Sequence, residues 1–507
     1  MGKNQTIEKK VGENTYVYER EPYYNSRIKN TSYRYRYVGK KEGGETRRIR
    51  STLPRRSLIH GPFIPLLGIS KSLGIEELLK KHLTSQESRE IIAMAVSKIV
   101  RPLPLSSLET WYDGTSLSRS LGVEMKSRRI GELLDKIGDS DLYRRFSSDL
   151  IKRLNPGNSL MYDITSVPSY SSAEILEYGH AKDHPDLEQI NLSMVMEKNH
   201  RIPVSFEVYS GSIPDVVTLK RTVENLKKAI HAIEIILDRG FFSHGNLYIL
   251  RNDSYIIAAS PVSKSVKNVF SSASRTVDRA DNVILFNNEP VFCRHVAFRM
   301  DDLELQGYFY HDPGRESDER ADFHRKLAEK RYAMEKLPVR KGIEGAIRAI
   351  AGSYMRYISY RIDNGRITTK GKNRAISGAE NRMGKFLLVY NGKYSPSECL
   401  AIYRDRDRIE KAFRILKTDL DLFPMRVRKE STIRGILFVF FISLILRSAL
   451  VRGMELSGLT RKYSLERMLL ELEKLHTVED VNGNLKELER TKKQKDILEA
   501  LDKISWW

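Results

Sequence analysis

Cysteine, tryptophan and long apolar runs are all scarce in this chain of 507 residues. Its two cysteines, Cys293 and Cys399, exclude a disulfide framework and a cysteine-rich zinc site, and they fit a reducing cytosol. The first residues, MGKNQTIEKKVGENT, lack the apolar segment that marks a secretory signal. We therefore expect a cytoplasmic protein.

The most apolar run is GILFVFFISLIL, Gly435–Leu446, which lies between Arg434 and Arg447. Its twelve residues are too few to span a bilayer, which needs about 20. We predict a buried core helix here and no membrane partner. Apolar residues make up 40% of the chain and aromatics 9%, which is enough for folded cores and excludes wholesale disorder.

Positive charge is what the chain has in excess. The formal net charge is +21 and the sequence pI is about 9.6. A protein this basic usually meets a polyanion, either a nucleic acid or an acidic membrane surface. A charge excess that only aids solubility is the alternative.

Residues 1–60 carry this excess most visibly, with 15 Lys/Arg against 6 Asp/Glu. Arginine alternates with tyrosine in SYRYRYV, which predicts a strand-rich amino-terminal arm, a small hairpin with a basic face. Such a strand suits contact with a nucleic-acid backbone and stacking on its bases. An ordinary exposed hairpin is the alternative.

Residues 61–155 show helical periodicity broken at glycine and proline, which predicts a compact helical domain. Within it, SLSRSLGVEMKSRRIGELLDKIG resembles a helix–turn–helix, with Arg128 and Arg129 near the start of the second helix. These residue types suit DNA binding, but any helical hairpin shows the same pattern, and plain packing remains open.

Residues 156–260 alternate between strands and helices in the order strand, strand, strand, helix, strand, helix, strand. This order predicts the first part of an RNase H-like α/β core with a mixed sheet. It places Asp163 at the end of the first strand and Asp238 at the end of the fourth. These two strands would be neighbours, so their acids would meet at one edge of the sheet.

Residues 261–402 form a large insertion before the second part of the core at 403–455, and we expect the insertion to be partly β. Within it, GRITTKGKNRAISGAENRMGK is rich in glycine and lysine and is expected to be a mobile loop. Residues 456–507 are predicted to be a carboxy-terminal helical region, in which Trp506 and Trp507 have no evident role.

The stretch YRDRDRIEKAFRILK carries four side chains at offsets 0, 3, 7 and 14, namely Tyr403, Arg406, Glu410 and Lys417. At about 100° per residue they fall within one helical stripe about 60° wide. Asp405 and Asp407 lie well off this stripe. On one face, the acid can bind a metal ion, while the two cations and the phenol suit phosphate oxygens.

Together with Asp163 and Asp238, Glu410 completes a set of three separated acids. Carboxylate oxygens are the ligands that Mg²⁺ prefers. In a phosphoryl transfer, two such ions can activate the attacking oxygen and stabilise the leaving oxygen. A single aspartate after a strand often only caps a turn. The three acids can act together only if their oxygens lie within about 10 Å of one another.

The segments DITS and DRGFF, together with the Tyr403, Arg406, Glu410 and Lys417 spacing, resemble DDE transposases of prokaryotic insertion sequences, in the subgroup with a Tyr-x2-Arg-x3-Glu-x6-Lys signature. The resemblance covers residues 155–260 and 383–450 well and 61–155 more loosely. It implies Asp163, Asp238 and Glu410 as catalytic ligands of two Mg²⁺ or Mn²⁺ ions. It also implies phosphate contacts from Tyr403, Arg406 and Lys417.

The same resemblance implies double-stranded DNA as partner, both as transposon ends with terminal inverted repeats and as target. It implies a homodimer in the synaptic complex, action at the nucleoid, and cut-and-paste strand transfer. Two other hypotheses fit the same residues. One is a metal-dependent nuclease on the same fold, and the other is a catalytically inactive DNA-binding regulator, against which the three intact acids argue.

Overall fold

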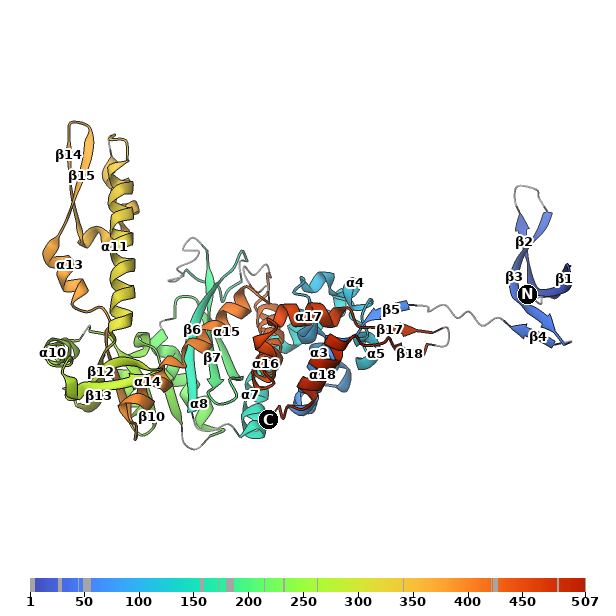
Figure 1. The fold of residues 1–507 in the computed structure, drawn as a ribbon, viewed down its shortest axis with the longest axis horizontal. Coiled ribbons are helices and arrows are strands. Elements are labelled where there is room, and N and C mark those ends of the chain that lie inside the picture. The colour runs from blue at the N-terminus through green and yellow to red at the C-terminus, as the bar shows by residue number, and fades with distance from the viewer. Residues whose placement is uncertain are drawn as a thin grey trace.

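The computed structural model of the chain describes residues 5–25, 30–43, 45–48, 56–155, 159–171, 173–178, 187–213, 215–230, 233–261, 263–340, 342–420, 422, 427–480 and 483–506. Figure 1 shows a large sheet beside a helical region, with a small amino-terminal sheet at one end and a projecting arm at the other.

The amino-terminal sheet has four antiparallel strands in sequence order: β1 (Gln5–Val11), β2 (Asn14–Asn25), β3 (Asn30–Glu42) and β4 (Glu45–Arg48). The predicted strands are confirmed, although they form a four-stranded sheet instead of a hairpin. Cations lie over its tyrosine rings, with Lys9 Nζ 4.5 Å from the Tyr35 centroid and the Arg20 guanidinium 4.3 Å from that of Tyr33. The sheet thus pairs aromatic faces with positive charge at its surface.

The helical prediction for residues 61–155 is confirmed. The helices are α1 (Phe63–Ser72), α2 (Ile75–Lys80), α3 (Ser85–Val100), α4 (Leu108–Tyr112), α5 (Leu117–Leu121), α6 (Ser127–Gly138) and α7 (Leu142–Leu154). A capping box of Thr84 and Glu87 starts α3. These helices share one continuous apolar core with the large sheet.

Helix α16 (Glu430–Leu456) contains the apolar run and has 27 residues, more than twice the run itself. A helix of this length and apolarity could span a bilayer, but 83% of its most apolar window is buried inside the protein. It packs against α3 and α6. At the α6 crossing a Cβ on Gly435 would lie 2.1 Å from the Leu134 carbonyl oxygen, so only glycine allows this approach.

The large sheet begins with the predicted order of elements. Its first five strands are β6 (Ser159–Pro168), β7 (Gln189–Glu197), β8 (Pro203–Ser210), β9 (Glu234–Leu237) and β10 (Ser254–Ala259). Helix α8 (Asp215–Lys227) precedes β9, and α9 (His244–Leu250) precedes β10. They pair in the order β8-β7-β6-β9-β10, with β6, β9 and β10 parallel and the other pairs antiparallel. The first and fourth strands are therefore neighbours, as predicted.

Four strands of the insertion extend this sheet to nine: β11 (Val283–Phe286), β12 (Glu289–Met300), β13 (Leu303–His311) and β16 (Lys385–Asn391). Helix α10 (Lys264–Ala273) contacts β12. The last strand in sequence, β16, pairs with both β10 and β13, so it joins the insertion to the first five strands.

Between β13 and β16 the chain forms the projecting arm of Figure 1, which consists of α11 (Pro313–Glu335), α12 (Ile343–Ala351), β14 (Ile358–Asp363), β15 (Arg366–Gly371) and α13 (Asn373–Glu380). The arm has its own apolar core, which includes Phe323, Ile347 and Ile367. The prediction of a mobile loop at residues 365–385 is wrong, because most of these residues form β15 and α13.

The carboxy-terminal region contains α17 (Leu465–Glu473), β17 (His476–Glu479), β18 (Leu485–Glu487) and α18 (Lys492–Asp502). Its helices are confirmed, and two short strands accompany them. Strand β17 pairs with β5 (Arg56–Ile59), which ties this region to the first helices. Trp506 packs against α16 at Gly453, and Trp507 lies outside the described residues.

Candidate active site

Asp163 and Asp238 come from the neighbouring strands β6 and β9. Asp238 directly follows β9, as predicted. Asp163 does not end its strand, because β6 continues to Pro168 against its antiparallel partner β7. The parallel pairing of β6 with β9 spans only 159–161. Asp163 thus lies just beyond the point where the two strands separate, on the same side as Asp238.

The predicted single helix that carries the third acid is wrong in one respect. It is two helices, α14 (Pro396–Arg404) and α15 (Asp407–Lys417), which meet at Asp405 and Arg406. Both joint residues keep right-handed helical φ and ψ angles, and the Arg406 N–H donates to the Tyr403 carbonyl, three residues back. The local tightening is of the 3₁₀ type. Tyr403 therefore ends one helix, and Glu410 lies in the first turn of the next.

The guanidinium of Arg406 lies among all three acids. Its Nη2 is 2.6 Å from Glu410 Oε1 and 3.8 Å from Asp238 Oδ1, and its Nη1 is 3.5 Å from Asp163 Oδ2. Because two carboxylate oxygens contact the same Nη2 atom, their separation cannot exceed the sum of 3.8 Å and 2.6 Å. Three acids spread over the sequence thus converge on one cation.

Burial makes this cluster electrostatically strong. The side chain of Arg406 is only 10% exposed and that of Asp163 14%. Burial raises the pKa of Asp163 to about 7, although the Arg406 charge and the Ile164 N–H oppose that rise. Burial alone would lower the pKa of Arg406, but the charges of Asp238, Tyr403 and Asp163 raise it on balance. The pocket therefore favours a positive charge and resists an uncompensated negative one.

Tyr403 supports this arrangement from the end of α14. Its hydroxyl donates to Asp238 Oδ1 at 3.2 Å, and burial followed by the charge of Asp238 raises its pKa. The phenol therefore stays protonated and keeps its hydrogen bond. Asp238 consequently accepts from Tyr403 and faces Arg406 with the same oxygen.

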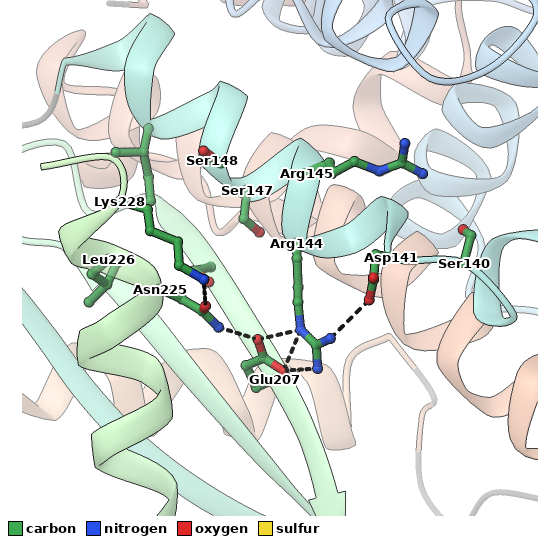
Figure 2. A pocket seen from close by; sticks show the side chains of 12 residues that line it. Ser140, Asp141, Arg144, Arg145, Ser147, Ser148, Glu207, Asn225, Leu226 and Lys228 are labelled. Atoms are coloured by element: carbon green, nitrogen blue, oxygen red, sulfur yellow. Dashed lines mark hydrogen bonds and ion pairs between the residues drawn. The ribbon is translucent and has the colours of Figure 1, made fainter.

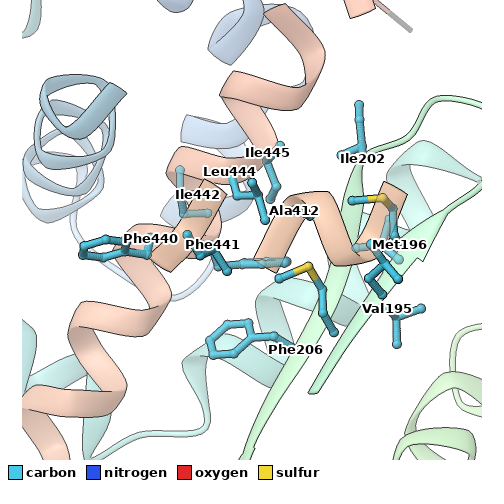
Figure 3. Packing of buried hydrophobic residues seen from close by; sticks show 14 of the residues in the cluster. Val195, Met196, Ile202, Phe206, Ala412, Phe440, Phe441, Ile442, Leu444 and Ile445 are labelled. Carbon is cyan, nitrogen blue, oxygen red and sulfur yellow. The ribbon is translucent and has the colours of Figure 1, made fainter. Parts of the chain in front are cut away.

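The apolar side of α15 fixes where Glu410 lies. Figure 3 draws Ala412 of α15, Phe441 of α16 and Met196 of β7 as members of one apolar cluster, and all three are buried. Phe441 in turn packs on Phe206 of β8, with ring centroids 4.8 Å apart. This packing holds α15 in place, and Glu410 extends from the exposed flank of the helix to Arg406.

The donor set fits a hard divalent cation, because it consists of carboxylate oxygens converging on one point. Among the described residues, no three His, Cys, Asp or Glu side chains lie close enough to share a metal as they stand. The guanidinium of Arg406 occupies the space between the acids and balances their charge. A cation would take that space once the guanidinium moved aside.

The remaining sequence-derived candidates lie on α15 and α6. Lys417 is the last residue of α15, seven residues after Glu410 on the same helix. Arg128 and Arg129 lie in the first turn of α6, where Arg128 pairs with Glu132 at 2.9 Å and Arg129 with the buried Glu90 at 3.3 Å. Their contacts with DNA, like the phosphate contact of Lys417, stay predictions.

Sequence reasoning missed a cation-rich cavity of about 420 Å³ between α15 and α16. Its lining includes Arg201, Arg404, Lys411 and Arg452. These cations come from four separate elements, so spacing along the chain could not reveal them. Arg404 also forms an ion pair with Asp312, at the base of the arm.

A second polar cavity, of about 580 Å³, lies between α7 and β8 (Figure 2), and none of the three acids lines it. There Arg144 Nε and Nη2 donate to the two oxygens of buried Glu207, at 2.8 Å and 2.9 Å, and Asn225 donates to the same carboxylate at 3.1 Å. The Glu207 charge is therefore fully partnered, and the ion pair joins the helical region to the edge of the sheet.

Comparison with known proteins gives one family. Residues 159–446, more than half of the chain, match the family of the transposase DDE domain. No curated protein matches the sequence.

Two solved structures are among those similar to this chain. The first is a piggyBac transposase synaptic complex with hairpin DNA, at 11% identity and a TM-score of 0.39, covering 81% of this chain and 79% of that one. The second is the Drosophila P element transposase strand transfer complex, at 14% identity and a TM-score of 0.19, covering 78% of this chain and 89% of that one.

Proposed function

This chain belongs to the family of transposases with a DDE domain, and from that premise we propose that it is the transposase of a prokaryotic insertion sequence. The observation that carries the proposal is the convergence of Asp163, Asp238 and Glu410 on one guanidinium. The strand order β8-β7-β6-β9-β10 supports an RNase H-like core beneath these acids. Tyr403, Arg406, Glu410 and Lys417 support the subgroup with the Tyr-x2-Arg-x3-Glu-x6-Lys signature.

Asp163, Asp238 and Glu410 hold their carboxylate oxygens at one edge of the sheet, where a scissile phosphate of DNA would lie. They would ligate two Mg²⁺ or Mn²⁺ ions, which when bound supply activation of the attacking oxygen and stabilisation of the leaving oxygen. Tyr403 orients Asp238 through its hydroxyl. With a cation bound by the acids, Arg406 would be able to take a phosphate bidentately, and Lys417 would add a point charge.

The reaction has two steps at this one site. Water first hydrolyses the phosphodiester at a transposon end, which leaves a 3′-hydroxyl on the DNA. That hydroxyl then attacks a phosphodiester of target DNA, displaces the 3′-oxygen of the target strand as a new 3′-hydroxyl, and so joins the two molecules. The reaction needs no covalent bond to the protein.

The partners of this activity are two transposon ends with terminal inverted repeats and a target duplex, at the nucleoid of the cytoplasm. Two ends must be cut and joined together, so we propose that a homodimer holds them in the synaptic complex. The net charge of +21 supports binding of this much phosphate.

The test uses the full-length protein and a duplex that carries the inverted repeat flanking this reading frame. Asp163→Asn, Asp238→Asn and Glu410→Gln should each reduce strand cleavage by about 1,000-fold or more, because each removes a ligand worth several kcal/mol in the transition state. Binding of the duplex should persist.

Asp407→Asn is the matched control, because Asp407 is an exposed acid in the first turn of the same helix and has no ion pair with Arg406. It should leave cleavage unchanged. Retained cleavage in any of the three acid variants would remove that residue from the ligand set. Cleavage by the wild type without joining of ends would instead favour the nuclease.

A further inference from the structure

The projecting arm divides into a neutral half and a basic half. Helix α11 has six Lys/Arg and six Asp/Glu, whereas residues 336–374 have ten Lys/Arg and two Asp/Glu. Charges on α11 pair with each other, as Arg315 does with Glu319 and Arg320 with Glu316, each at 2.7 Å. The excess positive charge of the arm is therefore carried by the segment that includes the β14–β15 ribbon.

The β14–β15 ribbon is a regular two-stranded hairpin. Its turn is Asn364–Gly365, and both residues have positive φ, 50° and 71°, as a tight hairpin turn requires. The cross-strand partners run from Asp363 with Arg366 to Ile358 with Gly371. This register fixes which side chains share a face.

The inner face of the ribbon is anchored to the arm. Ile358 and Ile367 are buried in the core of the arm, at 1% and 3% exposure. Thr369 receives hydrogen bonds from Arg331 of α11 at 3.0 Å and 3.1 Å, and donates its hydroxyl to Glu335 at 2.6 Å. The ribbon thus cannot rotate its inner face outward without breaking these contacts.

The outer face is exposed along its whole length and carries three cations, Arg361, Arg366 and Lys370. None of the three forms an ion pair with any residue that the structure describes. Asp363 is the one acid of this face, directly opposite Arg366. Three cations without an ion pair on one rigid, narrow surface favour an anionic partner of matching shape.

We propose that the outer face of the β14–β15 ribbon binds duplex DNA by entering its major groove. The groove is about 12 Å wide and admits a two-stranded ribbon, while phosphates on both its walls can meet Arg and Lys side chains. Six residues per strand give a ribbon about 20 Å long. This inference rests on the proposed function and names a second contact for the same DNA.

The position of the ribbon gives this contact its use. Helix α11 begins at Pro313, next to the ion pair of Asp312 with Arg404 at the end of α14. Its 23 residues extend about 35 Å from there, and Figure 1 shows the ribbon alongside its far end. That length is about one turn of DNA. The arm would therefore hold the duplex about one helical turn from the reacting phosphate.

The test compares two triple variants that lose the same charge from the same arm. Arg361→Gln, Arg366→Gln and Lys370→Gln change the ribbon, and Arg320→Gln, Arg325→Gln and Lys326→Gln change paired cations of α11. All six side chains are exposed, and circular dichroism would check that both variants fold. The probe is a mixed-sequence DNA duplex of about 40 base pairs, which is long enough to reach both contacts.

Plots of log affinity against log salt concentration should lose about 2.7 in slope for the ribbon variant, because each phosphate contact contributes about 0.9. The slope of the helix variant should stay at the wild-type value. Equal slopes for the two variants would overturn the inference, because the ribbon would then contribute only to the overall positive potential of the protein. A double variant, Arg361→Lys with Arg366→Lys, keeps the charge and should keep the slope.

An RNA duplex of the same sequence tests the groove itself, since its major groove is too deep and narrow for side chains to read. The ribbon variant should bind this RNA as the wild type does. An equal loss of slope on RNA and DNA would overturn seating in the groove. Unchanged duplex binding by the ribbon variant, in a wild type that cleaves and joins DNA ends, would refute this inference alone. A wild type that does neither would refute the proposed function.

Discussion

Arg406 should compete with divalent cations for the three acids, and Arg406→Gln should therefore strengthen cation binding. At about 4 Å and an effective dielectric of about 20, each contact of the guanidinium is worth about 4 kcal/mol before desolvation. Glu410 is 53% exposed and Asp238 34%, so solvent screens their share strongly. The buried contact with Asp163 dominates.

Two effects limit the net value of that contact. Desolvation of the guanidinium offsets much of the attraction. A carboxyl whose pKa is about 7 can also take up a proton when its partner is lost. We expect Arg406→Gln to lose about 2 kcal/mol of stability in the presence of a chelator, and to recover it when a divalent cation takes the vacated place.

The free energy of the lost Arg406 contact should also raise the affinity of the three acids for a cation. Removing a competitor worth about 2 kcal/mol should tighten Mn²⁺ binding by more than tenfold, since each 1.4 kcal/mol is a factor of ten. Electron paramagnetic resonance of free Mn²⁺ measures this without DNA and without turnover. Thermal unfolding with chelator and with Mn²⁺ measures the stability change.

Arg408→Gln is the matched control. Arg408 lies two residues after Arg406, pairs with Asp405 at 3.2 Å, and has no ion pair with the three acids. It should leave Mn²⁺ affinity at the wild-type value. Weaker or unchanged Mn²⁺ binding by Arg406→Gln would show that Arg406 does not hold the place of a cation.

Three further predictions concern the phosphate contacts, the amino-terminal sheet and the packing of α16. Lys417→Ala should reduce the salt dependence of binding to cleaved ends by a slope of about 1, and an unchanged slope would exclude a phosphate contact. Deletion of residues 1–48 should weaken DNA binding but leave thermal unfolding of the remaining fold unchanged, as measured by circular dichroism. Gly435→Ala should destabilise the protein by about 3 kcal/mol or more in urea unfolding, because its Cβ would meet the backbone of α6. Gly131→Ala, with open space at its Cβ, should stabilise α6 by up to about 1 kcal/mol.

The order of strands and helices in the first part of the core was predictable, because local periodicity distinguishes strands from helices. It also gave the neighbouring positions of Asp163 and Asp238, since the first and fourth strands of this order lie side by side. The length of β6 was not predictable. Asp163 lies inside the strand because pairing with β7 continues after pairing with β9 has ended.

The joint between α14 and α15 could not be predicted from RDRDRIE, which contains neither glycine nor proline. The chain tightens where Arg406 contacts acids from two strands that are far from it in sequence. A tertiary contact therefore accompanies the break between the helices. Because the joint keeps helical φ and ψ angles, the stripe of Tyr403, Arg406 and Glu410 still described one face. The geometry of the pattern survived although the single helix did not.

The arm was mispredicted for a different reason. Glycine and lysine in residues 365–385 indicated a loop, whereas Asn364–Gly365 is a turn signal between two short alternating strands. The inner face of the hairpin is apolar only in part, and Thr369 is buried through bonds to α11. Contacts with α11, about 40 residues away in sequence, hold the ribbon in its ordered conformation. A local sequence pattern cannot show such contacts.

The most direct test of the central claim loads the protein with Fe²⁺ in place of Mg²⁺ and adds ascorbate and peroxide. Hydroxyl radicals then cut the backbone close to the bound ion, and mass spectrometry locates the cuts. We predict cuts near residues 163, 238 and 410 together, which excess Mg²⁺ suppresses and Glu410→Gln removes. Cuts confined to one of these segments, or placed elsewhere in the chain, would contradict a single cation site built from the three acids.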